Sequence, residues 1–189
     1  MDYEIAEAEI LSTAAMCVND FNNDKKEILL VNVNNTHLID LLSHFNANIH
    51  ALNSKKADFA SNVAFYDLAI NIKVKRFDVI IDLQNQSVEN YQKLLKTSGI
   101  LLVDLKALKP DEILAKKADF NILMPFRIYE DLTQKYYLFA SNKFHPIADL
   151  SLQKLDLLEN LQYCNERTYN AVYAMPNYIK TALRGIARN

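Results

Sequence analysis

Two aspartates follow two of the most apolar segments of the chain, in positions where they can carry chemistry. Asp82 lies at the end of the apolar run 77–83, and Asp104 directly follows the apolar run 100–103. If both runs are parallel strands of one sheet, the two carboxylates share the crevice beyond the strand ends, where ligands bind in such folds. Paired carboxylates can orient an amine or act as a general base. For each acid alone, the competing interpretation is a helix cap or a solvated strand end.

Three asparagines occupy the turn where a nucleotide-binding α/β fold places glycines. Asn32, Asn34 and Asn35 lie in and after the apolar run 28–33, whereas the two glycines of the chain are elsewhere. Asparagine tolerates the left-handed backbone region better than other residues with a Cβ, so Asn34 and Asn35 can make the turn without glycine. Its side chain fills the space that a phosphate or an adenosine would occupy. The turn is therefore compatible with the α/β fold but argues against binding of a phosphate or an adenosine at this place.

Other catalytic and metal-binding patterns find no support in the sequence. The four histidines share no metal-ligand spacing; His37 and His44 are seven residues apart on one predicted helix, which supplies too few ligands. No serine lies in a glycine-flanked elbow, so Ser-His-Asp catalysis is not indicated. Cys17 and Cys164 fit neither a metal spacing nor a disulfide framework and are predicted to be buried thiols in a reducing compartment. We expect no metal site.

The elements that must position these residues alternate along the chain. The spacing of apolar residues predicts an amphipathic helix over 3–18. Strands are predicted at 28–33, 48–52, 77–83 and 100–103. Helices are predicted from a Thr36 cap, over 54–64, over 87–96 with Gly99 as its C-cap, and over 110–118. Runs 121–128 and 135–140 predict an antiparallel hairpin, and helices at 151–160 and 178–186 close the chain.

This order predicts an α/β fold. It is typical of a Rossmann-like, doubly wound sheet of the S-adenosylmethionine-dependent methyltransferase type, here with an antiparallel hairpin at the edge. At 189 residues and 50% hydrophobic residues, the chain suits one domain over 1–189. We expect a soluble globular protein with a substantial core.

Charge and hydropathy exclude two classes of partner. The formal net charge is -2, from 21 basic and 23 acidic residues spread along the chain, so no basic footprint predicts nucleic-acid binding. No apolar run is long enough to span a membrane, and no leader of the secretory type opens the sequence. We expect a cytoplasmic protein.

A tyrosine-rich stretch, 163–176, is the last distinctive feature. Its tyrosines can wall a pocket for an apolar or cationic ligand, or can pack the C-terminal segment onto the sheet. The stretch resembles the end of spermidine synthases, the polyamine aminopropyltransferases, which reads close to Tyr-Tyr-Asn and then His-Arg-Ala-Ala-Phe-Ala-Leu-Pro. The matching residues are Tyr163, Asn165, Ala171, Ala174 and Pro176. Residues 77–81 resemble the family's Tyr-Asp-Val-Ile-Ile strand, and Glu9 begins a match to Glu-Met-Leu in its first helix.

The resemblance implies transfer of an aminopropyl group from decarboxylated S-adenosylmethionine to putrescine, which yields spermidine and methylthioadenosine. In that family an aspartate after the central strand positions and deprotonates the amine, and other acids hold ribose and adenine. In this chain the candidate catalytic residues are Asp82 and Asp104, the acids at the strand ends that could substitute for the family's aspartate. Carried over to this chain, the resemblance implies cofactor contacts for Asn32, Asn34, Asn35 and Asp67, and substrate contacts for Glu9 and Tyr163.

The chain departs from the family pattern at most of these points. The family's Gly-Gly-Gly-Asp turn falls on 32–35, and the acid expected at the end of the second strand falls on Ala51. The family's Asp-Ser-Ser-Asp falls on 83–86, which leaves Asp82 one residue out of register. The Tyr-His of the first helix is Glu7-Ala8. The family's N-terminal β-rich domain has no counterpart in the sequence.

Three hypotheses follow. The first is a spermidine-synthase-like pseudoenzyme in which aminopropyl transfer is weak or absent, since loss of a general base alone costs about a hundredfold to ten-thousandfold in rate. The second is a working transferase that uses Asp82 or Asp104 as the acid. The third is a non-catalytic structural or regulatory partner that self-associates or pairs with another protein. Decarboxylated S-adenosylmethionine, methylthioadenosine or a polyamine is the ligand if the family site is retained.

Overall fold

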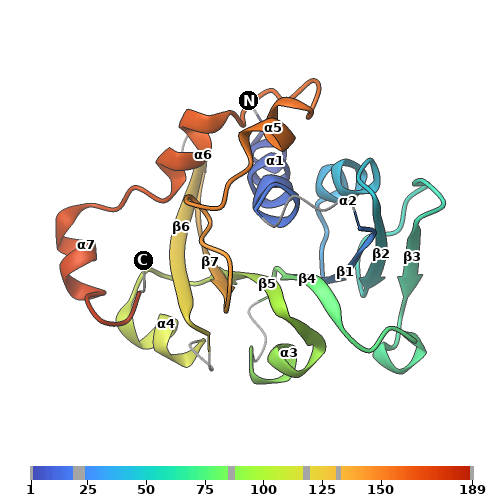
Figure 1. The fold of residues 1–189 in the computed structure, drawn as a ribbon, viewed down its shortest axis with the longest axis horizontal. Helices are drawn as coiled ribbons and strands as arrows, with labels where there is room; N and C mark the ends of the chain where they lie inside the picture. Colours follow the sequence, from blue (N-terminus) through green and yellow to red (C-terminus); the bar gives the residue numbers. More distant parts are fainter. Residues whose placement is uncertain (1, 19–23, 85–87, 117–119, 131–132, 188–189) are drawn as a thin grey trace.

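The computed structural model describes residues 2–18, 24–84, 88–116, 120–130 and 133–187 (Figure 1). Its centre is a seven-stranded sheet with the order β3-β2-β1-β4-β5-β7-β6. The strands are β1 (Lys26–Val31), β2 (Ala47–Leu52), β3 (Val63–Tyr66), β4 (Phe77–Asp82), β5 (Leu95–Leu105), β6 (Ile122–Glu130) and β7 (Thr133–Ser141). The first five strands are parallel, and β7 runs antiparallel to both β5 and β6. The predicted doubly wound sheet with an antiparallel edge hairpin is confirmed.

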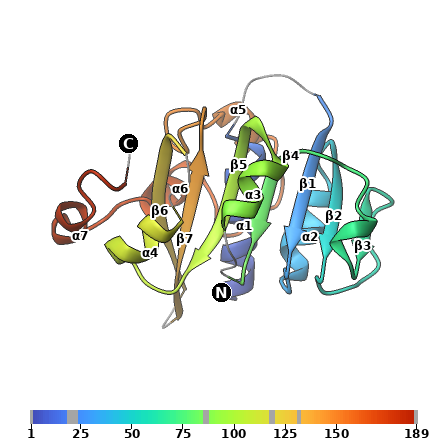
Figure 2. The ribbon, with the colours of Figure 1, turned by 90° about the horizontal axis from the view of Figure 1, so that it is seen from below.

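Helices cover both faces of the sheet (Figures 1 and 2). One face carries α1 (Tyr3–Met16), α2 (Thr36–Ser43), α5 (Leu152–Asp156) and α6 (Glu166–Val172). The other carries α3 (Val88–Leu94), α4 (Pro110–Ala115) and α7 (Asn177–Ala182). A short 3-10 turn, η1 (Ala69–Asn71), follows β3. Alternate residues of the parallel strands supply the two cores, one under each layer of helices.

Helix α1 is more deeply placed than its predicted amphipathic pattern indicates. Every residue from Ala6 to Met16 is buried. The helix packs on α2 and the sheet, and the C-terminal segment covers its other side, where Ser151 N–H donates to the Cys17 carbonyl at 2.9 Å. As a result two acids of this helix, Glu7 and Glu9, are removed from water and need partners inside the protein.

Three local predictions are wrong. The helix expected over 54–64 is absent; that stretch is irregular until β3 begins at Val63. Gly99 is not a helix C-cap, because it lies inside β5, which starts directly after α3. Helix α2 is capped by Asn35, whose side chain accepts the Leu38 N–H at 3.2 Å, and Thr36 is its first residue.

The C-terminal helices differ from prediction in length and number. Helix α5 is shorter than predicted, with Ser151 as its N-cap, and α7 starts at Asn177 and ends at Ala182. Helix α6 was not predicted; Asn165 begins it with a capping box that includes Thr168. Among the described residues, no helix is long and apolar enough to cross a membrane.

Candidate functional site

The carboxyl ends of the parallel strands place several of the predicted residues along one edge of the sheet. The register sets Val31 of β1 beside Asp82 of β4, and Asp82 beside Val103 of β5. Asn32 directly follows the end of β1, and Asp104 is one residue further along β5 than Val103. Because strand side chains alternate, this register directs Asp82 and Asp104 to opposite faces of the sheet. They share an edge but not one face.

Asp82 is fully buried. Its carboxylate accepts the Tyr91 hydroxyl at 2.8 Å and the Gln84 N–H at 3.0 Å. Burial, followed by the charge of Asp82, raises the pKa of the Tyr91 phenol. Lys116 is also buried at this edge: burial lowers the pKa of its ammonium group, and the negative charges of Asp104 and Asp82 oppose the shift. The edge thus holds buried charges of both signs.

The asparagine turn after β1 (32–35) differs from residue to residue in backbone conformation, burial and hydrogen bonding. Asn32 has a φ of 54°, so an asparagine does take the left-handed conformation here. Its backbone N–H donates to the Leu52 carbonyl at 2.9 Å, while its buried side-chain Nδ2 has no hydrogen-bond partner within the described part of the chain. Asn34 is exposed, and Asn35 is buried as the cap of α2.

Hydrogen bonds join this turn to the loop after β2. Val33 N–H donates to Ser54 Oγ at 3.1 Å, and Lys55 N–H donates to the Val33 carbonyl at 3.0 Å. The two loops that would flank a ribose in a nucleotide-binding sheet are therefore bonded to each other. Asp67 follows β3 at the outer end of the same edge; its side chain is exposed and pairs with Lys56 Nζ at 3.0 Å.

Glu9 and Tyr163 meet, but through the Tyr163 backbone. The Glu9 carboxylate accepts the N–H groups of Gln162, Tyr163 and Cys164 at 2.8, 2.8 and 2.7 Å. The Tyr163 hydroxyl donates to the Tyr129 carbonyl at 3.2 Å. These contacts attach the C-terminal segment to α1. The predicted role of both residues in substrate binding stays a prediction.

A second buried acid, Glu7, lies at the carboxyl edge and was not among the predicted site residues. Tyr137 of β7, which pairs with Asp104, donates its hydroxyl to Glu7 Oε1. Asn35 Nδ2 donates to Glu7 Oε2 at 2.9 Å, and Lys135 Nζ approaches Oε1 to 3.3 Å. The only signal in the sequence was the replacement of the family's tyrosine by glutamate at this position. The carboxylate is thus presented between β1, β7 and the start of α1.

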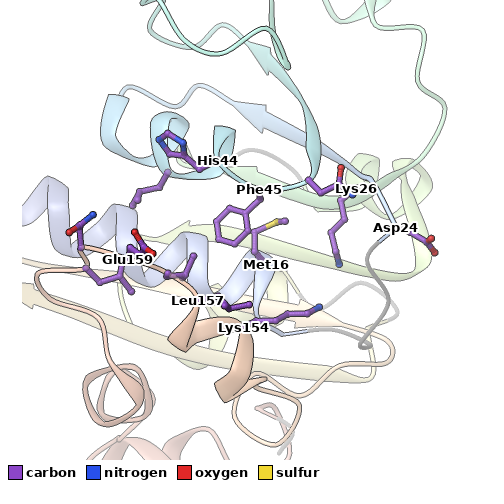
Figure 3. A pocket seen from close by; sticks show the side chains of 13 residues that line it. Met16, Asp24, Lys26, His44, Phe45, Lys154, Leu157 and Glu159 are labelled. Carbon is purple, nitrogen blue, oxygen red and sulfur yellow. The ribbon is translucent and has the colours of Figure 1, made fainter.

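Two hollows lie away from this edge. An open groove of about 660 Å³ lies at the amino ends of the strands, between α1, α2 and the α5 region, and includes Met16, Phe45 and Leu157 (Figure 3). Another, of about 830 Å³, lies between β6 and the segment that carries α6 and α7. Within the described ranges, no group of three or more His, Cys, Asp or Glu side chains could hold a metal ion.

Comparison with known proteins identifies relatives of this architecture. No family model matches the chain. A polyamine aminopropyltransferase of Helicobacter acinonychis (strain Sheeba) is 29% identical over 160 residues, which cover 78% of this chain and 58% of that protein. One from Helicobacter pylori (strain HPAG1) is 23% identical over 206 residues, covering 94% of this chain and 76% of the relative. The chain is a distant homologue of the polyamine aminopropyltransferases.

Solved structures agree with this homology at the level of the fold. Spermidine synthase from Thermotoga maritima superposes with a TM-score of 0.71 and 16% identity, over 96% of this chain and 74% of that one. The aminopropyltransferase homologue described here spans less than two thirds of the H. acinonychis protein's length. The carboxyl edge of its sheet carries the asparagine turn and the Glu7 contacts.

Proposed function

We propose that this chain is a spermidine-synthase-like pseudoenzyme, an aminopropyltransferase homologue in which aminopropyl transfer is weak or absent. The observation that carries the proposal is the pair of hydrogen bonds between Val33 and the loop at Ser54 and Lys55. Those bonds use backbone groups that a glycine-rich turn would leave open to a nucleoside.

The acids at this edge support the same proposal. An acid that deprotonates an amine needs an accessible oxygen within hydrogen-bond reach of it. Asp82 is fully buried and already accepts two hydrogen bonds, from Tyr91 and Gln84. At the end of β2, where the family has an acid, Ala51 is buried and offers no oxygen acceptor on its side chain. Each missing polar partner weakens ligand binding by about 1 to 3 kcal/mol.

The residues present fit a nucleoside only in part. The buried Nδ2 of Asn32 is a donor without a partner in the described residues, and it belongs to the turn that aligns with the family's glycine-rich turn. Decarboxylated S-adenosylmethionine or methylthioadenosine could use this donor, with Asn34, Asn35 and Asp67 as further contacts. This observation favours the second candidate, a working transferase in which Asp82 or Asp104 takes the role of the catalytic acid and Glu9 and Tyr163 contact the amine substrate.

A third candidate is a non-catalytic structural or regulatory partner in the cytoplasm. Large apolar side chains are exposed on the surface, with Leu68 at 61% and Leu157 at 74%. Such residues are compatible with self-association or with a protein partner.

The test is product formation by the purified protein with decarboxylated S-adenosylmethionine and putrescine. Mass spectrometry of spermidine and methylthioadenosine, with a Helicobacter polyamine aminopropyltransferase as positive control, should give a rate at least about a hundredfold lower than the control. A comparable rate that Asp82→Asn or Asp104→Asn abolishes would establish the working transferase instead. Calorimetry with methylthioadenosine separates the remaining cases: micromolar binding shows a retained nucleoside site.

A further inference from the structure

The hollow between β6 and the C-terminal segment has apolar walls and two cationic side chains. Figures 1 and 2 show α7 beyond β6, the strand at the end of the sheet. The hollow measures about 830 Å³, within the size range of pockets that hold small organic molecules. Its apolar wall includes Met124 of β6, Ile147 of the loop after β7, and Met175 of the C-terminal segment. Lys180 and Arg184 line it as well, and no aspartate or glutamate is among the described residues that do so.

Lys180 and Arg184 place two positive charges next to each other. Leu183 N–H donates to the Ile179 carbonyl at 2.9 Å, which continues the helical turn beyond α7. Arg184 N–H donates to the Thr181 carbonyl at 3.3 Å, so the two cationic residues are about one turn apart. Like charges four residues apart on a turn repel each other. Within the described ranges neither side chain forms an ion pair. An anion between the two groups would remove this repulsion.

The two cations alone would hold an anion weakly. Both residues are exposed, and ion pairs between exposed groups contribute little in water. The apolar wall offers a second source of affinity. Ile147 is 37% exposed and Met175 is half-buried, so both have apolar surface that a ligand can cover. The lining therefore suits an anionic group joined to an apolar body better than a bare inorganic ion.

We propose that this hollow binds an organic anion, a carboxylate or a phosphate monoester carried on an apolar body. The anionic group accepts hydrogen bonds from Lys180 and Arg184, whose guanidinium can donate two in parallel. The apolar body packs against Ile147 and Met175. The site lies beyond β6, three strands from β4 and its Asp82, so it is independent of the proposed function.

The experiment is a titration followed by the ¹³C-methyl NMR signals of methionine. Met124 and Met175 line the hollow, whereas Met16 lines the groove at the amino ends of the strands and serves as the internal reference. Substitution of each by leucine assigns its signal. Sodium 4-phenylbutyrate should shift the Met124 and Met175 signals to saturation, with a dissociation constant of about 1 mM or lower, and leave the Met16 signal unchanged. A parallel titration with phenyl phosphate shows which anionic group binds more tightly.

Two further compounds separate the charge from the apolar body, and both are used with the wild-type chain. 4-Phenylbutanamide has the same body without the charge, and inorganic phosphate has the charge without the body. Each should bind at least about 10-fold more weakly than the tighter phenyl anion, because it lacks one part of the contacts. The proposal is overturned if either binds as tightly, if both phenyl anions leave the Met124 and Met175 signals in place, or if the Met16 signal moves equally.

A pair of double variants tests the cationic residues. Lys180→Gln with Arg184→Gln should weaken binding of the phenyl anion about 10- to 100-fold. Lys73→Gln with Lys75→Gln is the matched control, because it removes two positive charges from exposed positions that do not line the hollow. It should bind like the wild type. Equal weakening in both double variants, or unchanged binding in the first, would overturn the proposal. These readouts report binding only, so they can fail or succeed separately from the test of aminopropyl transfer.

Discussion

At the scale of the residue, Glu9 shows how one buried acid attaches a distant segment of the chain. Its carboxylate accepts three consecutive backbone N–H groups, from Gln162 to Cys164. Hydrogen bonds to a charged acceptor are worth more than neutral ones, and a buried donor left unpaired costs about 1 to 3 kcal/mol. Glu9→Gln replaces an acceptor oxygen with an NH₂ group that faces N–H donors. We expect it to lower the free energy of unfolding by about 2 to 3 kcal/mol in urea titrations followed by circular dichroism.

Glu4→Gln is the matched control for this prediction, because Glu4 is exposed on the same helix. Removing the charge of Glu4 should change the free energy of unfolding by about 1 kcal/mol or less, because an acid in the first turn interacts with the helix dipole. Equal effects of the two substitutions would show that the loss comes from helix charge and not from the contacts of Glu9 with the C-terminal segment.

The site residues show what the sequence could and could not predict at this scale. A turn made by Asn34 and Asn35 in place of glycine was expected after the first strand; the left-handed asparagine there is instead Asn32. Glu7 was not selected, because its partners Asn35, Lys135 and Tyr137 are 28, 128 and 130 residues away. From the sequence alone, an acid without a partner nearby in the chain is expected at the surface. Its burial becomes evident only when the distant strands are known to lie beside it.

At the scale of the element, β5 explains why Gly99 is needed. A Cβ at this position would lie 2.7 Å from Leu95 Cδ2 and 3.0 Å from the carbonyl oxygen of Lys96. Contacts this short force a shift in a packed strand, and overpacking of this kind costs about 1 to 3 kcal/mol. Gly99→Ala should therefore lower the urea midpoint of unfolding at an unchanged slope.

A double-mutant cycle with Leu95→Val separates steric overlap from other effects at Gly99. Valine lacks the Cδ2 atom that the new methyl group would meet. Gly99→Ala should cost about 1 kcal/mol less in the Leu95→Val background than in the wild type. If the two substitutions are additive, overlap with Leu95 is not the reason for the glycine.

Elements with strong apolar patterns were predicted well, and those set by distant contacts were not. Residues 28–31 of β1 and 79–81 of β4 are continuously apolar, as expected of strands covered on both faces. The stretch 54–64 looked helical from its serine cap, but Ser54 bonds instead to Val33 N–H and the Leu52 carbonyl. Asn62 likewise donates to the carbonyls of Ser43 and Ala47. These side chains serve the loops around β2, and local propensity could not reveal that.

At the scale of the whole molecule, the structure keeps many weak acids out of water. Six buried side chains in the described ranges have raised pKa values, with burial as the largest cause: Cys17, Tyr91, Tyr137, Cys164, Tyr169 and Tyr173. Burial raises the pKa of the Cys17 thiol to about 12 and that of Cys164 to about 11. All six remain protonated in the folded protein under conditions where the unfolded chain releases their protons.

This difference predicts a steep loss of stability in alkali. A group whose pKa is higher in the folded state stabilises the fold fully below its unfolded pKa and loses that contribution as the pH rises toward its folded pKa. Each such proton contributes about 1.4 kcal/mol per pH unit, so six give up to about 8 kcal/mol per pH unit above pH ~10. Since domains are stable by about 5 to 15 kcal/mol, cooperative unfolding is expected within about two pH units above pH 9. As the pH is raised, the ultraviolet absorbance of the buried tyrosines on ionisation and the far-ultraviolet circular dichroism should change over the same pH range.

The thiols provide the control for alkaline unfolding. Cys17→Ala with Cys164→Ala removes two of the six protons and leaves the four buried tyrosines in place. The loss of unfolding free energy per pH unit should become smaller by up to about 3 kcal/mol, because each of the two protons contributes about 1.4 kcal/mol per pH unit. Ionisation of the four buried tyrosines without loss of circular dichroism would contradict the prediction, since it would mean that hydroxide reaches these phenols in the folded protein. Unfolding that coincides with ionisation would show that the two cores open as one unit.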